Sequence, residues 1–261
     1  MKTLLFANQK GGVGKSTLVC QLAYYLSEKL GLRVLVIDTD AQGNTTKAMR
    51  TGGIATVSEI TAARVFAEQV ESIEQGTLVV LPATDALKKL EQLKADHNAF
   101  ASNFKNFLGT VQGFDACIID TNPFPDIRVI AAMVAADHIV SPVQLNQEAI
   151  DGIGALIADV KRIKQALNPS LNLIGILPNQ VQPTPFQKAN FAELSKHFGK
   201  LLVSLGEGRY AAVKSSTALP EAQAAGLPVW KLGKTSARET WKEMEPAFAK
   251  IATDMGVNNG N

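Results

Sequence analysis

The chain has 261 residues, of which 46% are hydrophobic and 19% are charged, and its formal net charge at pH 7 is +2. A chain of this length and composition can bury a substantial core, and so small a charge does not by itself imply a polyanionic partner. No apolar stretch approaches the roughly 20 residues needed to span a bilayer, and the N-terminus does not resemble a signal peptide. Together these features predict a cytoplasmic protein.

Short apolar runs with β-branched residues alternate along the chain with longer segments of helical periodicity. The predicted strands are residues 3–7, 33–37, 77–81, 116–119, 138–142 and 171–177, and the predicted helices are residues 16–29, 85–108, 126–136 and 147–167. Strands that are apolar on both faces and separated by helices predict an α/β fold, with a mainly parallel, twisted sheet and helices on both faces. Ligands of such sheets bind beyond the carboxyl ends of the strands.

The domain organisation follows from the absence of internal repeats and low-complexity linkers. We predict a single domain over residues 1–261, with no DNA-binding domain ahead of the first strand. Residues 257–261 are predicted to form a frayed polar tail.

The first predicted strand leads into a glycine-rich loop, NQKGGVGKST, and then into a helix. In this context backbone N–H groups wrap phosphate oxygens and the helix N-terminus adds its positive end. Lys15 would neutralise phosphate charge, and the Ser16 hydroxyl would bind Mg²⁺. The spacing departs from the usual phosphate-loop pattern, because Gln9 stands where that pattern has its first glycine. The candidate ATP-binding residues of the loop are Lys10, Gly11, Gly12, Val13, Gly14, Lys15, Ser16 and Thr17.

Two apolar strands end in acids. Strand 33–37 is followed by Asp38-Thr39-Asp40, and strand 116–119 is followed by Asp120. Carboxylates at neighbouring strand ends supply the oxygen ligands that Mg²⁺ prefers, usually through water. The acids at these two strand ends, together with Ser16, are therefore the candidate metal ligands.

The stretches KGGVGKST, VLVIDTDAQGN and CIIDTNP resemble the ParA/MinD branch of deviant-Walker P-loop ATPases, and the resemblance covers essentially the whole chain. The tail GLPVWKLGKTSARETWKE is similar to that of short plasmid IncC-like members. The resemblance implies that Lys10 is the signature lysine that reaches across a dimer to the partner's nucleotide. It also implies that Lys15 acts in cis on phosphate and that Asp40 orients the attacking water.

The resemblance further implies that Asp38 and Asp120 belong to the magnesium shell and that Asn179 reads the adenine edge. A plain loop asparagine ahead of the turn at residues 183–185 is the open alternative for Asn179. Two positions depart from the family pattern, since Ala41 stands where proline is usual and Asn122 where proline or alanine is usual. Neither departure removes a ligand, and the effect of Asn122 on the hydrolysis rate is left open.

The implied function is ATP hydrolysis to ADP and phosphate, with ATP and Mg²⁺ as cofactors and weak basal activity. By resemblance, an ATP-dependent homodimer binds non-specific DNA on the nucleoid and partitions plasmids or chromosomes. Since the sequence offers no obvious arginine finger in cis, we expect a ParB-type centromere-binding protein to stimulate hydrolysis.

The C-terminal region, residues 196–255, is basic. Between Lys196 and Lys250 it carries nine Lys or Arg against five Asp or Glu, so it is the basic end of the chain. The candidate DNA-binding residues are Arg209, Lys214, Lys234, Arg238 and Lys242. The last three recur every four residues and form one stripe on a helix, with an apolar face of Ala237, Trp241 and Met244 beside it. A solvated charged face is the alternative interpretation. Pro246 predicts a kink or a new helix.

Two rival functions share part of these motifs. A MinD-like membrane-associated ATPase ends in an amphipathic membrane helix, which the polar residues 256–261 and a helix broken at Pro246 disfavour. A reductase like the nitrogenase iron protein needs paired cysteines at the dimer face. Cys20 and Cys117 lie in apolar runs and are expected to be buried as small hydrophobic residues.

Overall fold

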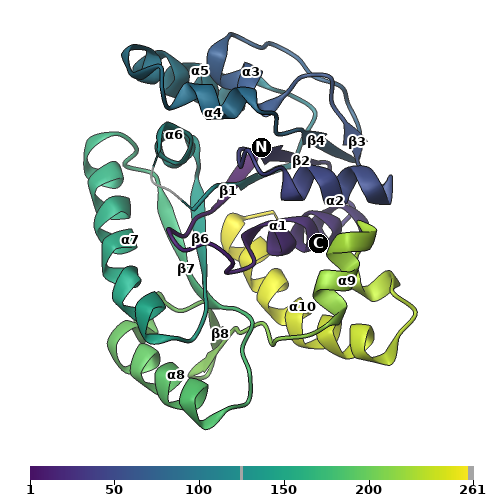
Figure 1. Ribbon diagram of the computed structural model, residues 1–261, viewed down its shortest axis with the longest axis vertical. Coiled ribbons are helices and arrows are strands. Elements are labelled where there is room, and N and C mark those ends of the chain that lie inside the picture. Colours follow the sequence, from purple (N-terminus) through teal and green to yellow (C-terminus); the bar gives the residue numbers. More distant parts are fainter. Residues whose placement is uncertain (124–125, 258–261) are drawn as a thin grey trace.

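The protein is described here by a computed structural model that covers residues 1–123 and 126–257 (Figure 1). At its centre lies a seven-stranded sheet in the order β3-β4-β2-β5-β1-β6-β7, in which every pair of neighbours is parallel. The strands are β1 (Lys2–Phe6), β2 (Val34–Asp38), β3 (Thr56–Val57), β4 (Leu78–Leu81), β5 (Ala116–Asp120), β6 (His138–Val143) and β7 (Asn172–Pro178). Two short strands, β8 (Ser204–Gly206) and β9 (Arg209–Tyr210), form an antiparallel ribbon. The predicted parallel α/β fold is confirmed.

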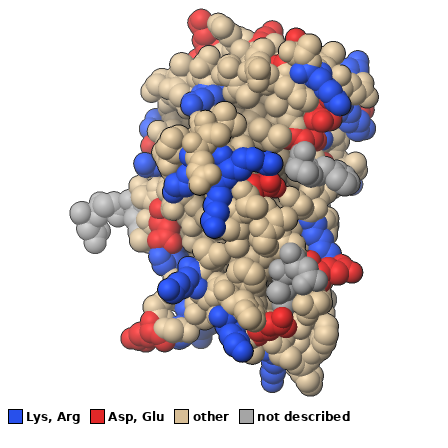
Figure 2. Space-filling model, turned by 90° about the vertical axis from the view of Figure 1, so that its left-hand side faces the viewer, with Lys and Arg blue, Asp and Glu red and all other residues tan. Residues whose placement is uncertain are grey.

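Helices cover both faces of the sheet (Figure 1). They are α1 (Lys15–Tyr24), α2 (Asn44–Gly52), α3 (Ala62–Ala67), α4 (Ala86–Leu90), α5 (His97–Thr110), α6 (Ile127–Ala135), α7 (Gln147–Ala166), α8 (Pro185–Phe198), α9 (Ala218–Ala225) and α10 (Thr235–Met255). On the side of the molecule where α7 and α8 lie, basic and acidic side chains are interspersed (Figure 2). That face therefore presents no broad surface of one charge.

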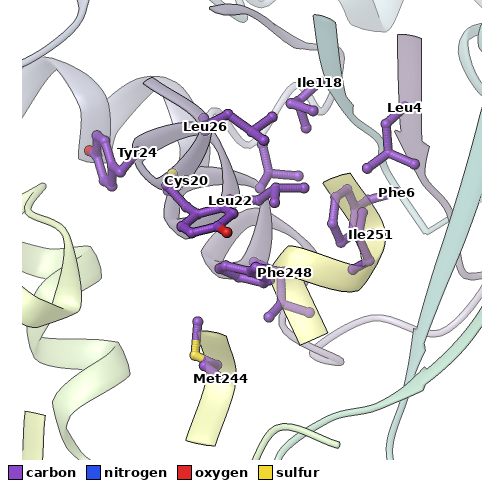
Figure 3. Packing of buried hydrophobic residues seen from close by; sticks show 14 of the residues in the cluster. Leu4, Phe6, Cys20, Leu22, Tyr24, Leu26, Ile118, Met244, Phe248 and Ile251 are labelled. Carbon is purple, nitrogen blue, oxygen red and sulfur yellow. The ribbon is translucent and has the colours of Figure 1, made fainter. Parts of the chain in front are cut away.

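The core consists of two hydrophobic layers, one on each face of the sheet. Side chains alternate along each strand, so Leu4 and Phe6 of β1 pack toward α1 and α10, whereas Leu5 packs toward α3, α5 and α6. Figure 3 shows the first layer, in which Phe248 and Ile251 of α10 lie against residues of α1 and β1. Cys20 and Cys117 are fully buried, as expected.

The predicted single helix over residues 85–108 is wrong, because the segment divides into α4, the 3-10 turn Lys94–Asp96 and α5. Leu90 of α4 and Phe100 of α5 are both buried in the same layer. Ten residues separate them, which is not a whole number of turns at 3.6 residues per turn. The break lets both apolar stripes face the sheet.

Of the two alternatives predicted at Pro246, a kink or a new helix, the new helix is wrong, because α10 runs without interruption from Thr235 to Met255. The proline costs one hydrogen bond, but Lys242 and Pro246 are both exposed, so the carbonyl freed four residues earlier lies on the solvent side. Continuing the helix keeps Phe248 and Ile251 on the same buried layer as Trp241. The packing of the whole apolar stripe outweighs one lost bond.

The C-terminal end is better packed than the predicted frayed tail, since Val257 is buried. The rest of that predicted tail, residues 258–261, lies outside the described residues. Within the part of the chain that is described, no helix has the length and apolar character needed to cross a membrane.

Candidate nucleotide and magnesium site

The site lies where the carboxyl ends of three neighbouring strands meet. The register pairs Phe6 of β1 with Asp120 of β5, and Asp120 with Asp38 of β2. The loop that follows β1 therefore begins beside both carboxylates, as the strand-end rule requires.

The glycines of the loop have backbone conformations that other residues rarely adopt. Gly12 has a φ of 76° and Gly14, which precedes α1, has a φ of 85°. A Cβ on Gly14 would also lie 2.4 Å from the amide nitrogen of Asn179. The loop and the first turn of α1 line a cavity of about 630 Å³, together with Asp40 and residues of α2 and α9. This is a concave, amide-lined site of the kind that binds phosphates.

Lys15 is buried beneath this loop. Its Nζ donates to the carbonyl oxygens of Asn8, at 3.3 Å, and of Lys10, at 3.4 Å. Burial lowers the pKa of Lys15, and the charges of Asp120 and Asp40 act in the opposite direction. The ammonium therefore lies inside the loop, in a position to contact a phosphate bound there.

Asp120 and Asp38 form a buried carboxylate pair. Asp120 Oδ2 accepts a hydrogen bond of 2.7 Å from Thr45 Oγ1, and Asp120 Oδ1 is buried without a partner among the described residues. Asp38 Oδ2 accepts from Thr46 N at 2.8 Å and from Thr46 Oγ1 at 2.6 Å. Burial raises the pKa of both carboxyls, and for Asp38 the neighbouring Asp120 raises it further.

These residues fit a hard divalent cation. Two adjacent buried carboxylates, one with an oxygen that no described residue satisfies, lie beside the Ser16 hydroxyl. Burial raises the pKa of Asp120, and the nearby Ser16 hydroxyl opposes part of that shift. No cluster of three or more acidic, His or Cys ligands occurs among the described residues. A set of one hydroxyl and two carboxylates leaves coordination positions for phosphate and water, which is the arrangement that Mg²⁺ favours.

Asp40 stands at the wall of the cavity. Its side chain is half-buried, and Oδ1 accepts a hydrogen bond of 3.0 Å from Gln42 N. Ala41, at the position where the family usually has proline, packs on the apolar layer behind it. The carboxylate thus faces the same cavity as the phosphate loop.

Lys10 points away from that cavity. Its Nζ donates to Glu148 Oε2 at 2.7 Å and to Asn146 Oδ1 at 3.3 Å, at the start of α7. The side chains of Lys10 and Glu148 are 33% and 82% exposed. Within one chain Lys10 therefore has an exposed ion pair instead of the phosphate contact that its position in the loop suggests.

The comparisons with known proteins agree with this geometry. A family model described as an AAA domain matches residues 1–173. Protein IncC from Escherichia coli is 35% identical over 99% of this chain and 71% of its own length, and the chromosome-partitioning ATPase Soj from Thermus thermophilus is 32% identical over 77% and 78%. The chain belongs to the ParA-type ATPase family. The ATP complex of McdA from Cyanothece has the same fold, with a TM-score of 0.80 and 21% identity over 100% of this chain and 98% of that one.

Asn179 of this ParA-type ATPase supports the phosphate loop directly. Its Nδ2 donates to Val13 O at 2.7 Å, and its Oδ1 is buried without a partner among the described residues. It lines a cavity of about 270 Å³ that shares Gly14, Thr17 and Gln180 with the main cavity. Asn179 thus lies between the phosphate loop and a side chamber of the nucleotide cavity.

Several residues of the ParA-type site were not predicted from the sequence. Thr45 and Thr46 hold the two carboxylates, and Lys47 lines the main cavity from the same helix. Gln180, with a φ of 57°, and Gln144 each donate through Nε2 to Gly12 O, at 3.1 Å and 3.3 Å. The two threonines directly follow the AQGN stretch, so their place in that motif was the available signal.

The five predicted DNA-contact residues are all exposed but differ in their partners. Arg209 pairs with Glu207 at 3.6 Å, Lys214 with Glu243, and Lys234 with Glu221. Arg238 and Lys242 on α10 have no ion pair in the described part of the chain. Lys214 also lines the side chamber next to Asn179. The structure therefore places Arg238 and Lys242 on α10 and Lys234 at the extended residue just before that helix, so only two of the three predicted stripe residues are helical. Lys214 pairs with Glu243 of α10 and lines the side chamber.

Proposed function

We propose that this chain is an ATP hydrolase whose ATP-bound homodimer binds non-specific DNA and partitions a plasmid or chromosome. The observation that carries the proposal is the position of Lys10. A second lysine stands at the entrance of a phosphate loop but does not face the cavity of its own chain. A lysine placed in this way can serve a nucleotide held by a second copy. The similarity to Soj, which is named a chromosome-partitioning ATPase, supports the same function.

In this proposal the ATP phosphates lie on the loop of Gly11, Gly12, Val13 and Gly14, with Lys15, Ser16 and Thr17 completing the contacts. Ser16, Asp38 and Asp120 hold Mg²⁺, which when bound neutralises charge on the transferred phosphoryl group. Asn179 accepts a hydrogen bond from the adenine edge through the buried Oδ1 that no described residue satisfies.

Hydrolysis in this proposal depends on Asp40, which orients water against the terminal phosphate from the cavity wall. Among the described residues that line the cavity there are lysines but no arginine. Basal hydrolysis is therefore slow, and a ParB-type partner that supplies a positive group accelerates it by a factor of about 10³–10⁵.

The dimer acts as a switch because its two nucleotide states differ by one phosphate. Lys10 of each subunit contacts the terminal phosphate only when two subunits face each other, and ADP offers no such phosphate. A ligand shifts an equilibrium only through its different affinity for the two states. ATP therefore favours the dimer, and hydrolysis releases it.

DNA binding in this proposal uses the basic residues Arg209, Lys214, Lys234, Arg238 and Lys242 of both subunits. Contacts with phosphates carry no sequence information and weaken steeply with salt. In this proposal the basic region 196–255 is part of the same domain as the nucleotide site, which the shared hydrophobic layer of α10, α1 and β1 supports. The apolar face of α10, which includes Trp241 and Phe248, is buried against the core, so this helix offers no apolar face for a MinD-like membrane contact.

The experiment compares binding to random-sequence DNA with ATP, with ADP and without nucleotide, for the wild type and for Lys10→Ala. We expect tight, salt-sensitive binding only for wild type with ATP, while Lys10→Ala still binds ATP but not DNA. Equal DNA affinity in all nucleotide states would contradict the proposal. Flotation with liposomes in place of DNA would point to the MinD-like alternative.

A further inference from the structure

The first turn of α2 lies directly against the carboxylate pair. Thr45 and Thr46 are both buried, and each donates its hydroxyl proton to a different carboxylate. Neighbouring residues of the same helix, Asn44, Lys47, Ala48 and Thr51, line the nucleotide cavity. One helical segment therefore touches both the acids and the space that the nucleotide would occupy.

The hydroxyl of Thr45 has a fixed direction. Cys20 Sγ donates to Thr45 Oγ1 at 3.8 Å, and Thr45 Oγ1 donates to Asp120 Oδ2 at 2.7 Å. The alternative acceptor, Ser16 O, is farther away at 3.4 Å. Because Asp120 Oδ2 is engaged, the oxygen left for a ligand is Oδ1, which is buried and has no partner among the described residues.

Thr46 likewise donates its hydroxyl proton to one oxygen of Asp38. Its Oγ1 accepts from Ala83 N at 2.9 Å, so its own proton goes to Asp38 Oδ2, at 2.6 Å. The backbone N–H of Thr46 donates to the same oxygen at 2.8 Å. Asp38 Oδ1 is left with one long bond, of 3.3 Å, from Asp40 N. Each carboxylate therefore has one oxygen tied to α2 and one oxygen available on the other side.

We propose that Thr45 and Thr46 are positioning residues for Mg²⁺, which set the rotation of Asp120 and Asp38 and present Oδ1 of each to the metal. Hydrogen bonds to ligating carboxylates raise metal affinity by fixing their orientation. Because both threonines belong to α2, the metal site is tied to the wall of the nucleotide cavity. The inference rests on the proposed magnesium site, but it does not depend on dimerisation or on DNA binding.

The test uses Thr45→Val, which keeps the shape and removes the hydroxyl. We expect its affinity for Mn²⁺, measured by electron paramagnetic resonance with a non-hydrolysable ATP analogue present, to fall about 10- to 100-fold. Thr45→Ser restores the hydroxyl and should restore the affinity. Thr46→Val should lose less, since its backbone N–H still holds Asp38. The control Thr110→Val removes a hydroxyl bonded only to helix carbonyls of α5, and it should change nothing.

A purely structural role gives a different result. In that case Thr45→Val would melt at a lower temperature in EDTA, yet bind Mn²⁺ as tightly as the wild type, and the inference would be wrong. If Thr45→Val does not fold, Thr46→Val provides the comparison, with a smaller but still measurable loss of Mn²⁺ affinity expected. A wild type whose nucleotide affinity is the same in Mg²⁺ and in EDTA would instead overturn the magnesium site of the proposed function itself.

Discussion

We predict that Glu148→Gln strengthens ATP-dependent dimerisation. In the single chain Glu148 Oε2 lies 2.7 Å from Lys10 Nζ. In the proposed dimer this pair must separate before Lys10 can reach the second subunit's phosphate. The glutamate side chain is 82% exposed, so the ion pair contributes little free energy to the monomer. An exposed ion pair changes an equilibrium by up to about fivefold. Since each dimer releases two such lysines, the dimer dissociation constant should fall by up to about 25-fold.

The assay is analytical ultracentrifugation with a non-hydrolysable ATP analogue at low salt. Glu68→Gln is the matched control, because Glu68 forms an exposed ion pair with Arg64 in the region of α3, away from the phosphate loop. The gain in dimer affinity of Glu148→Gln should become smaller at high salt, where exposed charges are screened. If Glu148→Gln dimerises like the wild type at low salt, or if Glu68→Gln gains as much, then Glu148 does not restrain Lys10.

Three further predictions concern the rest of the molecule. Gly226→Ala should destabilise the protein by more than about 2 kcal/mol in chemical denaturation, because Gly226 has a φ of 65° and a Cβ there would lie 2.1 Å from Ala48 O. Gly109 is an exposed helix position with open space around it, so Gly109→Ala should instead raise the free energy of unfolding by about 0.5–1 kcal/mol. In EDTA, Asp38→Asn should gain melting temperature relative to the wild type as the pH rises above about 4. Burial and Asp120 raise the folded-state pKa of Asp38 to about 8, above its unfolded value, so the wild type loses stability as the pH rises from about 4 to about 8 and loses no more from this group above that range. Parallel profiles of melting temperature against pH for the two proteins would contradict this. Arg238→Ala should weaken binding to all DNA sequences alike and lower the salt slope by about one, as measured by fluorescence anisotropy, and a loss confined to one sequence would argue against phosphate contacts.

The fold and the position of the site could be predicted because local patterns specify them. Apolar strands with β-branched residues alternate with helices, and such strands pair in parallel, so Asp38 and Asp120 had to meet at one edge of the sheet. The phosphate loop is a contiguous motif with its own backbone requirements, of which the positive φ of Gly14 is one. Each of these signals lies within a few residues of the chain.

What could not be predicted depends on packing between distant segments. The break before α5 follows from the phase of Phe100 relative to Leu90 on a shared core, which periodicity within one segment does not show. The helix through Pro246 depends on the buried layer beneath α10. The pairing of Lys10 with Glu148 joins residues 138 positions apart. In each case a tertiary contact overrides or adds to the local preference.

The central claim is that the terminal phosphate of ATP draws two copies of this chain together through Lys10. The most direct measurement is the molar mass in solution, by light scattering after size-exclusion chromatography, with a non-hydrolysable ATP analogue, with ADP and without nucleotide. We predict a dimer only with the ATP analogue, and a monomer for Lys10→Ala in all three conditions although it still binds the analogue. A wild-type dimer that forms equally with ADP or without nucleotide would contradict the account.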